Sequence, residues 1–102
     1  MSNVDFFRKF ISDSLMNLKD KNSNDILLIY EFLHLCSKKE GFNDYCIEKY
    51  GEYKSICIKQ ILGLISIDYL LINDNFKNTQ GINNDKINNL KELLEVLVLL
   101  AS

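Results

Sequence analysis

The feature that most constrains this chain is a run of polar residues between Asp44 and Asn73 that recur three or four positions apart. This spacing is typical of one side of an α-helix, where each residue advances by about 100°. The positions are Glu48, Glu52, Ser55, Lys59, Gly63, Ser66 and Asn73. Proline, which would break a helix, is absent from the sequence. The pattern therefore predicts one long helix over 44–73.

Asp68 interrupts the opposite, apolar side of this predicted helix. The residues that share that side with it are Tyr50, Cys57, Ile61 and Leu64. A buried carboxylate is costly unless another group pairs with it. We therefore expect Asp68 to pair with a tyrosine hydroxyl or a lysine, to line a small pocket, or to reach water where the helix bends. Asp68 and Tyr50 form the candidate buried polar site.

Apolar stripes at helical spacing predict three further helices. With the long one, the expected elements cover 3–19, 24–40, 44–73 and 85–101. The third is the longest, with a bend expected near Gly51 or Gly63, and the second is apolar around most of its circumference. A chain of 102 residues can bury one sizeable core. The sequence thus predicts a single domain over 1–102, an all-α compact bundle of about four helices.

A competing interpretation concerns 64–76, where Ile-Ser-Ile-Asp-Tyr alternates apolar and polar residues. Such alternation, with isoleucine and tyrosine, also favours a strand. A strand pair after three helices would indicate a winged-helix domain. The three-and-four polar spacing continues through Ser66 to Asn73, so we favour the helix.

Composition excludes several classes of partner. The net charge is -2, and no basic block is present to bind phosphate, so we expect no nucleic-acid ligand. The longest apolar stretch, 61–72, is shorter than the roughly 20 residues of a membrane span and contains Asp68. Three cysteines lie in apolar runs and match no disulfide scaffold, and the N-terminus lacks the order of a secretory signal. These features predict buried thiols and a cytoplasmic protein.

The sequence offers little for metal binding or catalysis. His34 is the only histidine, and Cys36 lies about 200° from it around a helix, so the two cannot reach one metal ion. The same geometry opposes a catalytic group of Cys36, His34 and Asp68. We therefore expect no metal, no cofactor and no enzyme activity, with His34 facing solvent.

Two segments have the composition of an interaction surface. Between Asp44 and Tyr53 three tyrosines lie among acidic residues, and acidic groups steer a basic partner. We expect Tyr50 and Tyr53 to face the core, and the candidate partner-binding residues are Asp44, Tyr45, Glu48 and Glu52. Near the C-terminus the polar side of the last helix disappears. The candidate residues for self-association there are Val96, Leu99 and Leu100.

By analogy with other small acidic helical domains, these features favour a non-enzymatic protein-binding domain. The function we expect is a small acidic inhibitor or immunity-type protein that neutralises a protein partner. A basic partner would complement its acidic surface. The alternative is a self-associating structural or regulatory protein, a homodimer through its apolar C-terminal helix. A third interpretation is a small-molecule pocket or an enzyme centred on Asp68.

Overall fold

The computed structural model describes residues 5–75 and 82–102, and these ranges contain helices and turns but no strand. The elements are α1 (Phe6–Met16), the short 3₁₀-helix η1 (Leu18–Asp20), α2 (Ser23–Lys38), α3 (Phe42–Tyr50), α4 (Glu52–Asn75) and α5 (Asn84–Leu100). The predicted all-α fold is confirmed, with five α-helices in these ranges where about four were expected. Because 64–75 is helical, the winged-helix alternative is wrong there. Position 76 lies outside the described residues.

The additional helix arises at Gly51, where the predicted 44–73 helix is broken in two. Gly51 has φ +92°, a left-handed conformation that costs glycine little because it has no Cβ. Its N–H donates to the Ile47 carbonyl at 2.9 Å and closes α3, and its own carbonyl accepts from the Ser55 N–H at 3.0 Å. In contrast, α4 continues through Gly63 without interruption.

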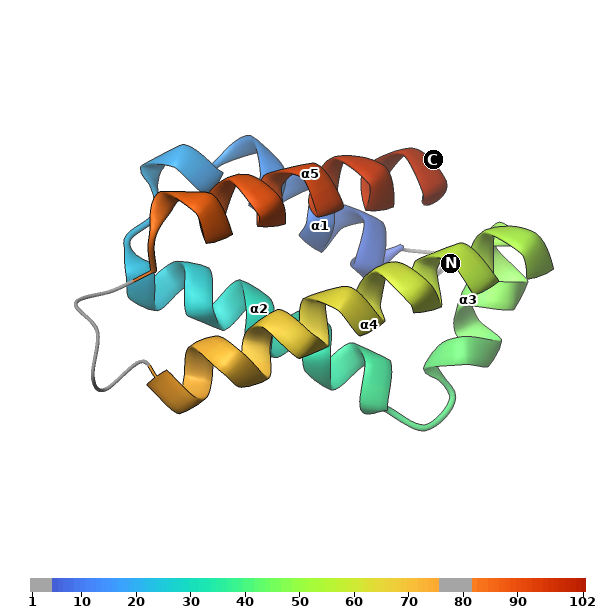
Figure 1. Ribbon diagram of the computed structural model, residues 1–102. Helices are drawn as coiled ribbons and strands as arrows, with labels where there is room; N and C mark the ends of the chain where they lie inside the picture. Colours follow the sequence, from blue (N-terminus) through green and yellow to red (C-terminus); the bar gives the residue numbers. More distant parts are fainter. Residues whose placement is uncertain (1–4, 76–81) are drawn as a thin grey trace.

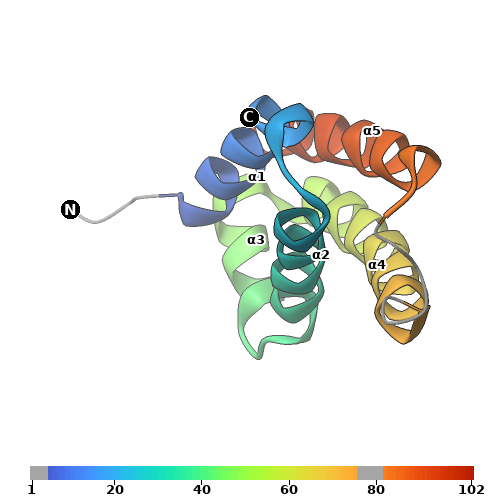
Figure 2. The ribbon, with the colours of Figure 1, turned by 90° about the vertical axis from the view of Figure 1, so that its left-hand side faces the viewer.

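The helices form two layers with one helix across an end. Helices α1 and α5 pack against each other in one layer, and α2 and α4 pack against each other in the second (Figure 1). Helix α3 contacts both α2 and α4 at one end. Viewed along the bundle, α4 lies at an outer corner, with α2 beside it and α5 above it (Figure 2).

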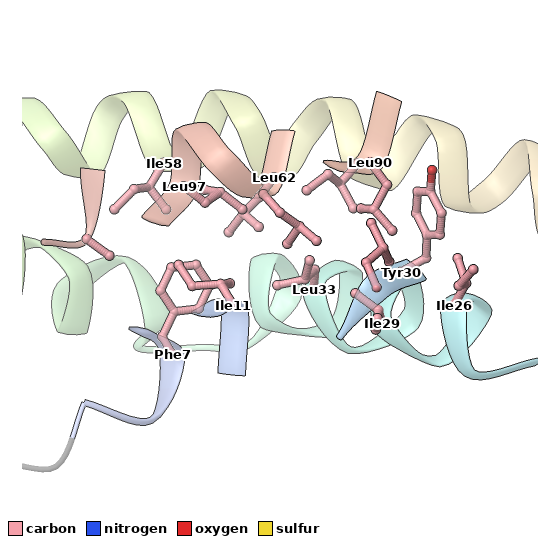
Figure 3. Packing of buried hydrophobic residues seen from close by; sticks show 14 of the residues in the cluster. Phe7, Ile11, Ile26, Ile29, Tyr30, Leu33, Ile58, Leu62, Leu90 and Leu97 are labelled. Atoms are coloured by element: carbon pink, nitrogen blue, oxygen red, sulfur yellow. The ribbon is translucent and has the colours of Figure 1, made fainter. Parts of the chain in front are cut away.

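The core lies between the two layers and receives side chains from every helix. Figure 3 shows Leu62 of α4 and Leu97 of α5 facing Ile11 of α1 and Leu33 of α2. Tyr30 is also buried, and its hydroxyl donates to the Lys86 carbonyl at 3.2 Å. This bond satisfies the polar atom of an otherwise apolar side chain.

The face of α4 that packs inward differs from the predicted one. Ser55 and Ile65 are buried, whereas Cys57 and Leu64, which we expected inside, are exposed. Ser55 can be buried because its hydroxyl donates to the Gly51 carbonyl at 2.7 Å. Since α4 is apolar on two sides, the polar spacing could not decide which side the core would take.

Candidate functional site

An apolar ridge runs along the outward face of α4. Its residues, here called the α4 ridge, are Tyr53, Ile56, Leu64, Ile67 and Leu70. Each of these side chains is more than half exposed, and Tyr53 reaches 87%. They recur at helical spacing, with Gln60 between Ile56 and Leu64, so they lie on one side of the helix. Burial of Tyr53, which the sequence interpretation expected, is therefore wrong.

The exposure of this helix is unusual for its composition. By length and composition alone, α4 over Glu52–Asp74 is apolar enough to cross a membrane, and its most apolar window of 18 residues has a mean hydropathy of 1.7. Only 22% of its most apolar window is buried within the protein, whereas the core helix of a soluble protein is mostly buried. The sequence interpretation considered only 61–72 and underestimated this property, because apolar residues also precede that stretch at Ile56, Cys57 and Ile58.

Acidic residues mark both ends of the α4 ridge. Glu52 begins α4 and Asp74 lies in its last turn, and both are exposed. No basic residue occupies the last turn, where the helix dipole already places partial negative charge. Lys59 is exposed three residues after Ile56, so it lies along the edge of the ridge that adjoins α2 and far from the C-terminal end. The C-terminal end of the ridge is consequently its more negative end.

The predicted partner-binding residues divide into two groups. Asp44, Glu48 and Glu52 are exposed, as an interaction surface requires. Tyr45 is half-buried, and its hydroxyl donates to an Asp5 carboxylate oxygen at 2.7 Å. Tyr45 therefore holds α3 to the start of α1 and does not stand in solvent beside the acidic residues.

The carboxylate of Asp5 is the centre of a cluster that the sequence interpretation missed. It accepts from the Tyr50 hydroxyl at 2.6 Å, from the Tyr45 hydroxyl at 2.7 Å, and from the Arg8 N–H at 2.9 Å as the N-cap of α1. Burial raises the pKa of Asp5, but these hydrogen bonds outweigh it and hold the pKa below its ordinary value. Burial and the bond to Asp5 raise the pKa of Tyr50.

Asp68 is paired within the bundle. Its carboxylate forms an ion pair with Lys86 at 3.0 Å and accepts from the Asn89 amide at 2.8 Å. The side chain of Asp68 is 14% exposed, so the pair is partly screened by water. Tyr50 bonds Asp5 at another place in the fold, so the structure does not bring the two residues of the candidate buried polar site together.

His34 belongs to a polar seam between α2 and α4. Its Nδ1 lies 2.9 Å from the Ser66 hydroxyl, and its ring stacks on Tyr69 with centroids 5.0 Å apart. Ser37 donates to the His34 carbonyl at 2.6 Å and lies 3.3 Å from the Ser66 hydroxyl. The expectation that His34 faces solvent is wrong, because these groups satisfy one another between the helices.

The three cysteines differ in burial. Cys46 is buried, Cys36 is half-buried and Cys57 is exposed, so the expectation of three buried thiols is wrong for Cys57. Burial raises the pKa of the Cys36 thiol to about 11 and, with smaller contributions from Cys36 and Asp5, that of Cys46 to about 12. Within 5–75 and 82–102, no three metal-binding side chains cluster.

An aromatic groove of about 330 Å³ lies between α1, the end of α2 and the start of α3. Its principal lining residues are Phe6, Phe7, Phe32, Cys36, Phe42 and Tyr45. Phe7 and Phe42 meet edge to face, with ring centroids 5.3 Å apart. The sequence interpretation missed this groove because its residues come from three separate segments.

The residues predicted for self-association lie near the end of α5. Leu99 and Val96 are exposed, and Leu100 is half-buried against the core. Their exposed apolar surface is therefore shorter along the helix axis than the α4 ridge, which extends from Tyr53 to Leu70.

Comparisons with known proteins found no relative of this chain. The chain matches no protein-family model, no curated protein and no solved structure at a significant level.

Proposed function

We propose that this chain is a non-enzymatic protein-binding domain of the inhibitor or immunity type, and that it binds its partner on the α4 ridge. The observation that carries the proposal is the exposure of five apolar side chains along one face of α4. Soluble monomers rarely expose large contiguous apolar patches, and such patches are typical of interaction sites.

The acidic residues of α3 and α4 have a supporting role in this proposal. Asp44, Glu48 and Glu52 would steer a basic partner toward the ridge, because exposed charges affect association rates more than affinity. We assign Tyr45 to the fold, since its hydroxyl is bonded to Asp5. Substituting Tyr45 would therefore confuse loss of binding with loss of structure.

Three affinity baits test the proposal. They are the wild type, Ile67→Glu on the ridge, and, as a control, Lys91→Glu at an exposed position of α5. We expect the wild type and Lys91→Glu to recover the same partner and Ile67→Glu to lose it. With the purified partner, titration calorimetry should show at least a roughly tenfold weaker complex for Ile67→Glu. Circular dichroism checks that all three baits are folded.

Equal recovery of every partner by the three baits would contradict the proposed interface. Loss of a partner by a Glu48→Lys, Glu52→Lys variant together with full retention by Ile67→Glu would instead place the interface on the acidic residues.

A second candidate function is self-association through α5. The exposure of Leu99 and Val96 favours it. Sedimentation would then show a concentration-dependent homodimer that Leu99→Glu dissociates and Ile67→Glu does not. A monomer at all concentrations would exclude this candidate.

A further inference from the structure

Negative charges at the two ends of the α4 ridge restrict the kind of molecule that can bind along it. Glu52 and Asp74 are both exposed, and they bracket a face whose centre is apolar. The dipole of α4 offsets Glu52 at the N-terminal end but adds to the negative potential of Asp74 at the C-terminal end. A molecule that covers the whole ridge must therefore have an apolar surface in its middle and, at its two ends, groups that are not repelled by Glu52 and Asp74.

A second copy of this chain meets that requirement poorly. If two α4 ridges pack antiparallel, Glu52 of each copy lies near Asp74 of the other. If they pack parallel, Glu52 meets Glu52 and Asp74 meets Asp74. Like charges oppose each other in both arrangements, and such juxtaposition suppresses the wrong partner at an interface.

A lipid surface also meets the requirement poorly. Helices that lie in a membrane interface carry lysine or arginine beside their apolar face, where they are attracted to anionic lipids. Lys54 and Lys59 are exposed on the flanks of the ridge, but its two ends carry carboxylates, which anionic lipids repel.

We infer that the occupant of the α4 ridge is an amphipathic helix of a protein partner, with an apolar stripe and basic residues at both of its ends. Apolar anchors spaced at i, i+3, i+4 and i+7 would lie along the ridge, as in other cases of helix recognition. This inference rests on the proposed function and specifies the chemistry of its partner.

Gly63 supports a helical occupant. It lies on the same face as Ile56 and Ile67, and a Cβ placed on it would meet nothing within 4 Å. Glycine within a helix is less favourable than alanine, and no neighbour inside this protein requires the missing side chain. A notch at this position lets a partner helix approach the backbone of α4.

Two synthetic peptides of about 23 residues, long enough at about 1.5 Å per residue to reach from Glu52 to Asp74, test the inference. Both carry leucine at i, i+3, i+4 and i+7 in an alanine-rich background. One has lysines at both ends and the other has glutamates at the same positions. Titration calorimetry measures each against the wild type, Ile67→Glu, Asp74→Asn and Glu52→Gln.

We expect the lysine peptide to bind roughly tenfold more tightly than the glutamate peptide in low salt, and this preference to shrink as salt is added. Ile67→Glu should abolish binding of both peptides. Asp74→Asn should reduce the preference more than Glu52→Gln, because the helix dipole compensates Glu52 but not Asp74.

The remaining outcomes separate the inference from the proposed function. If both peptides bind equally and Ile67→Glu abolishes both, the inferred charge pattern is wrong and the ridge remains a binding face. If the wild type dimerises, or floats with phosphatidylcholine and phosphatidylserine vesicles, and Ile67→Glu does not, the occupant is a second copy or a lipid surface. If no peptide binds and neither association occurs, the inference is overturned, whereas the proposed function still depends on whether the wild-type bait recovers a partner that Ile67→Glu loses.

Discussion

Asp5 shows how one carboxylate can fasten two helices. It caps α1 through the Arg8 N–H and accepts hydroxyl hydrogen bonds from Tyr45 and Tyr50 of α3. Hydrogen bonds to a charged acceptor are stronger than neutral ones, so the cluster stabilises the folded state while Asp5 is ionised. Because the pKa of Asp5 is lowered by folding, this contribution is present above the ordinary carboxyl pKa and is lost as pH falls through the folded value.

Asp5→Asn is expected to lower the free energy of unfolding at pH 7 by about 1–3 kcal/mol, because the charged acceptor is lost. The difference from the wild type should be smaller at pH 3, below the ordinary aspartate pKa of 3.8, because the unfolded chain then binds a proton that Asp5 binds less readily in the folded state. Asp13→Asn is the matched control, since Asp13 forms only an exposed ion pair with Lys9. Urea denaturation at the two pH values measures all three proteins, and a pH-independent difference would contradict this account.

The ion pair between Asp68 and Lys86 is expected to couple the two residues by about 0.5–1 kcal/mol, because it is only partly exposed. A double-mutant cycle with Asp68→Asn and Lys86→Met measures that coupling from urea denaturation. A coupling of zero would show that the pair contributes nothing to stability.

Sequence reasoning found one of these two acids and missed the other. Asp68 stood out because its helical neighbours are apolar, and pairing with a lysine was among the expected solutions. Asp5 gave no such signal, because its tyrosine partners lie 40 and 45 positions away in the chain. Contacts of that separation depend on how helices pack, which local periodicity does not encode.

Among the helices, the two glycines expected to bend the long helix behave differently. Gly51 takes a left-handed conformation with φ +92° and separates α3 from α4. Gly63 lies within α4, where any residue could adopt the backbone conformation. Of these two positions, only Gly51 therefore requires glycine for the fold.

Gly63→Ala is expected to raise the free energy of unfolding by about 0.5–1 kcal/mol, because alanine is the better helix former and its Cβ meets no other atom. Gly51→Ala should lower it by about 1 kcal/mol or more, because alanine is strained at positive φ. Thermal and chemical denaturation measure both. Destabilisation by Gly63→Ala would indicate that the position is constrained within the protein.

The helices themselves were predictable, whereas the orientation of α4 was not. Polar spacing identified the helix, and the glycines marked where a break could occur. Helix α4 has apolar residues on two sides, however, and Ser55 is buried while Leu64 is exposed. Packing against α2 and α5 decides which side of α4 faces inward, and the periodicity of a single sequence does not predict that side.

At the scale of the whole molecule, the core and the α4 ridge are separate apolar surfaces. The core is shared by the five described α-helices between the two layers. The ridge lies outside the core, on α4. Figure 2 shows that α4 lies at an outer corner of the bundle. With this assignment, the core stabilises the fold, whereas the ridge contributes little to stability and stays exposed for the proposed partner. Residues of the same type on the two surfaces should therefore respond differently to the same substitution.

Ile65 and Ile67 provide the most direct comparison, because they are two positions apart on α4 and are 0% and 58% exposed. Urea denaturation of Ile65→Ala and Ile67→Ala measures the free energy of unfolding of each variant against the wild type. We predict a loss of about 2–5 kcal/mol for Ile65→Ala and a change within about 0.5 kcal/mol for Ile67→Ala. Equal losses, or a larger loss for Ile67→Ala, would contradict the assignment of the two faces and with it the proposed interface.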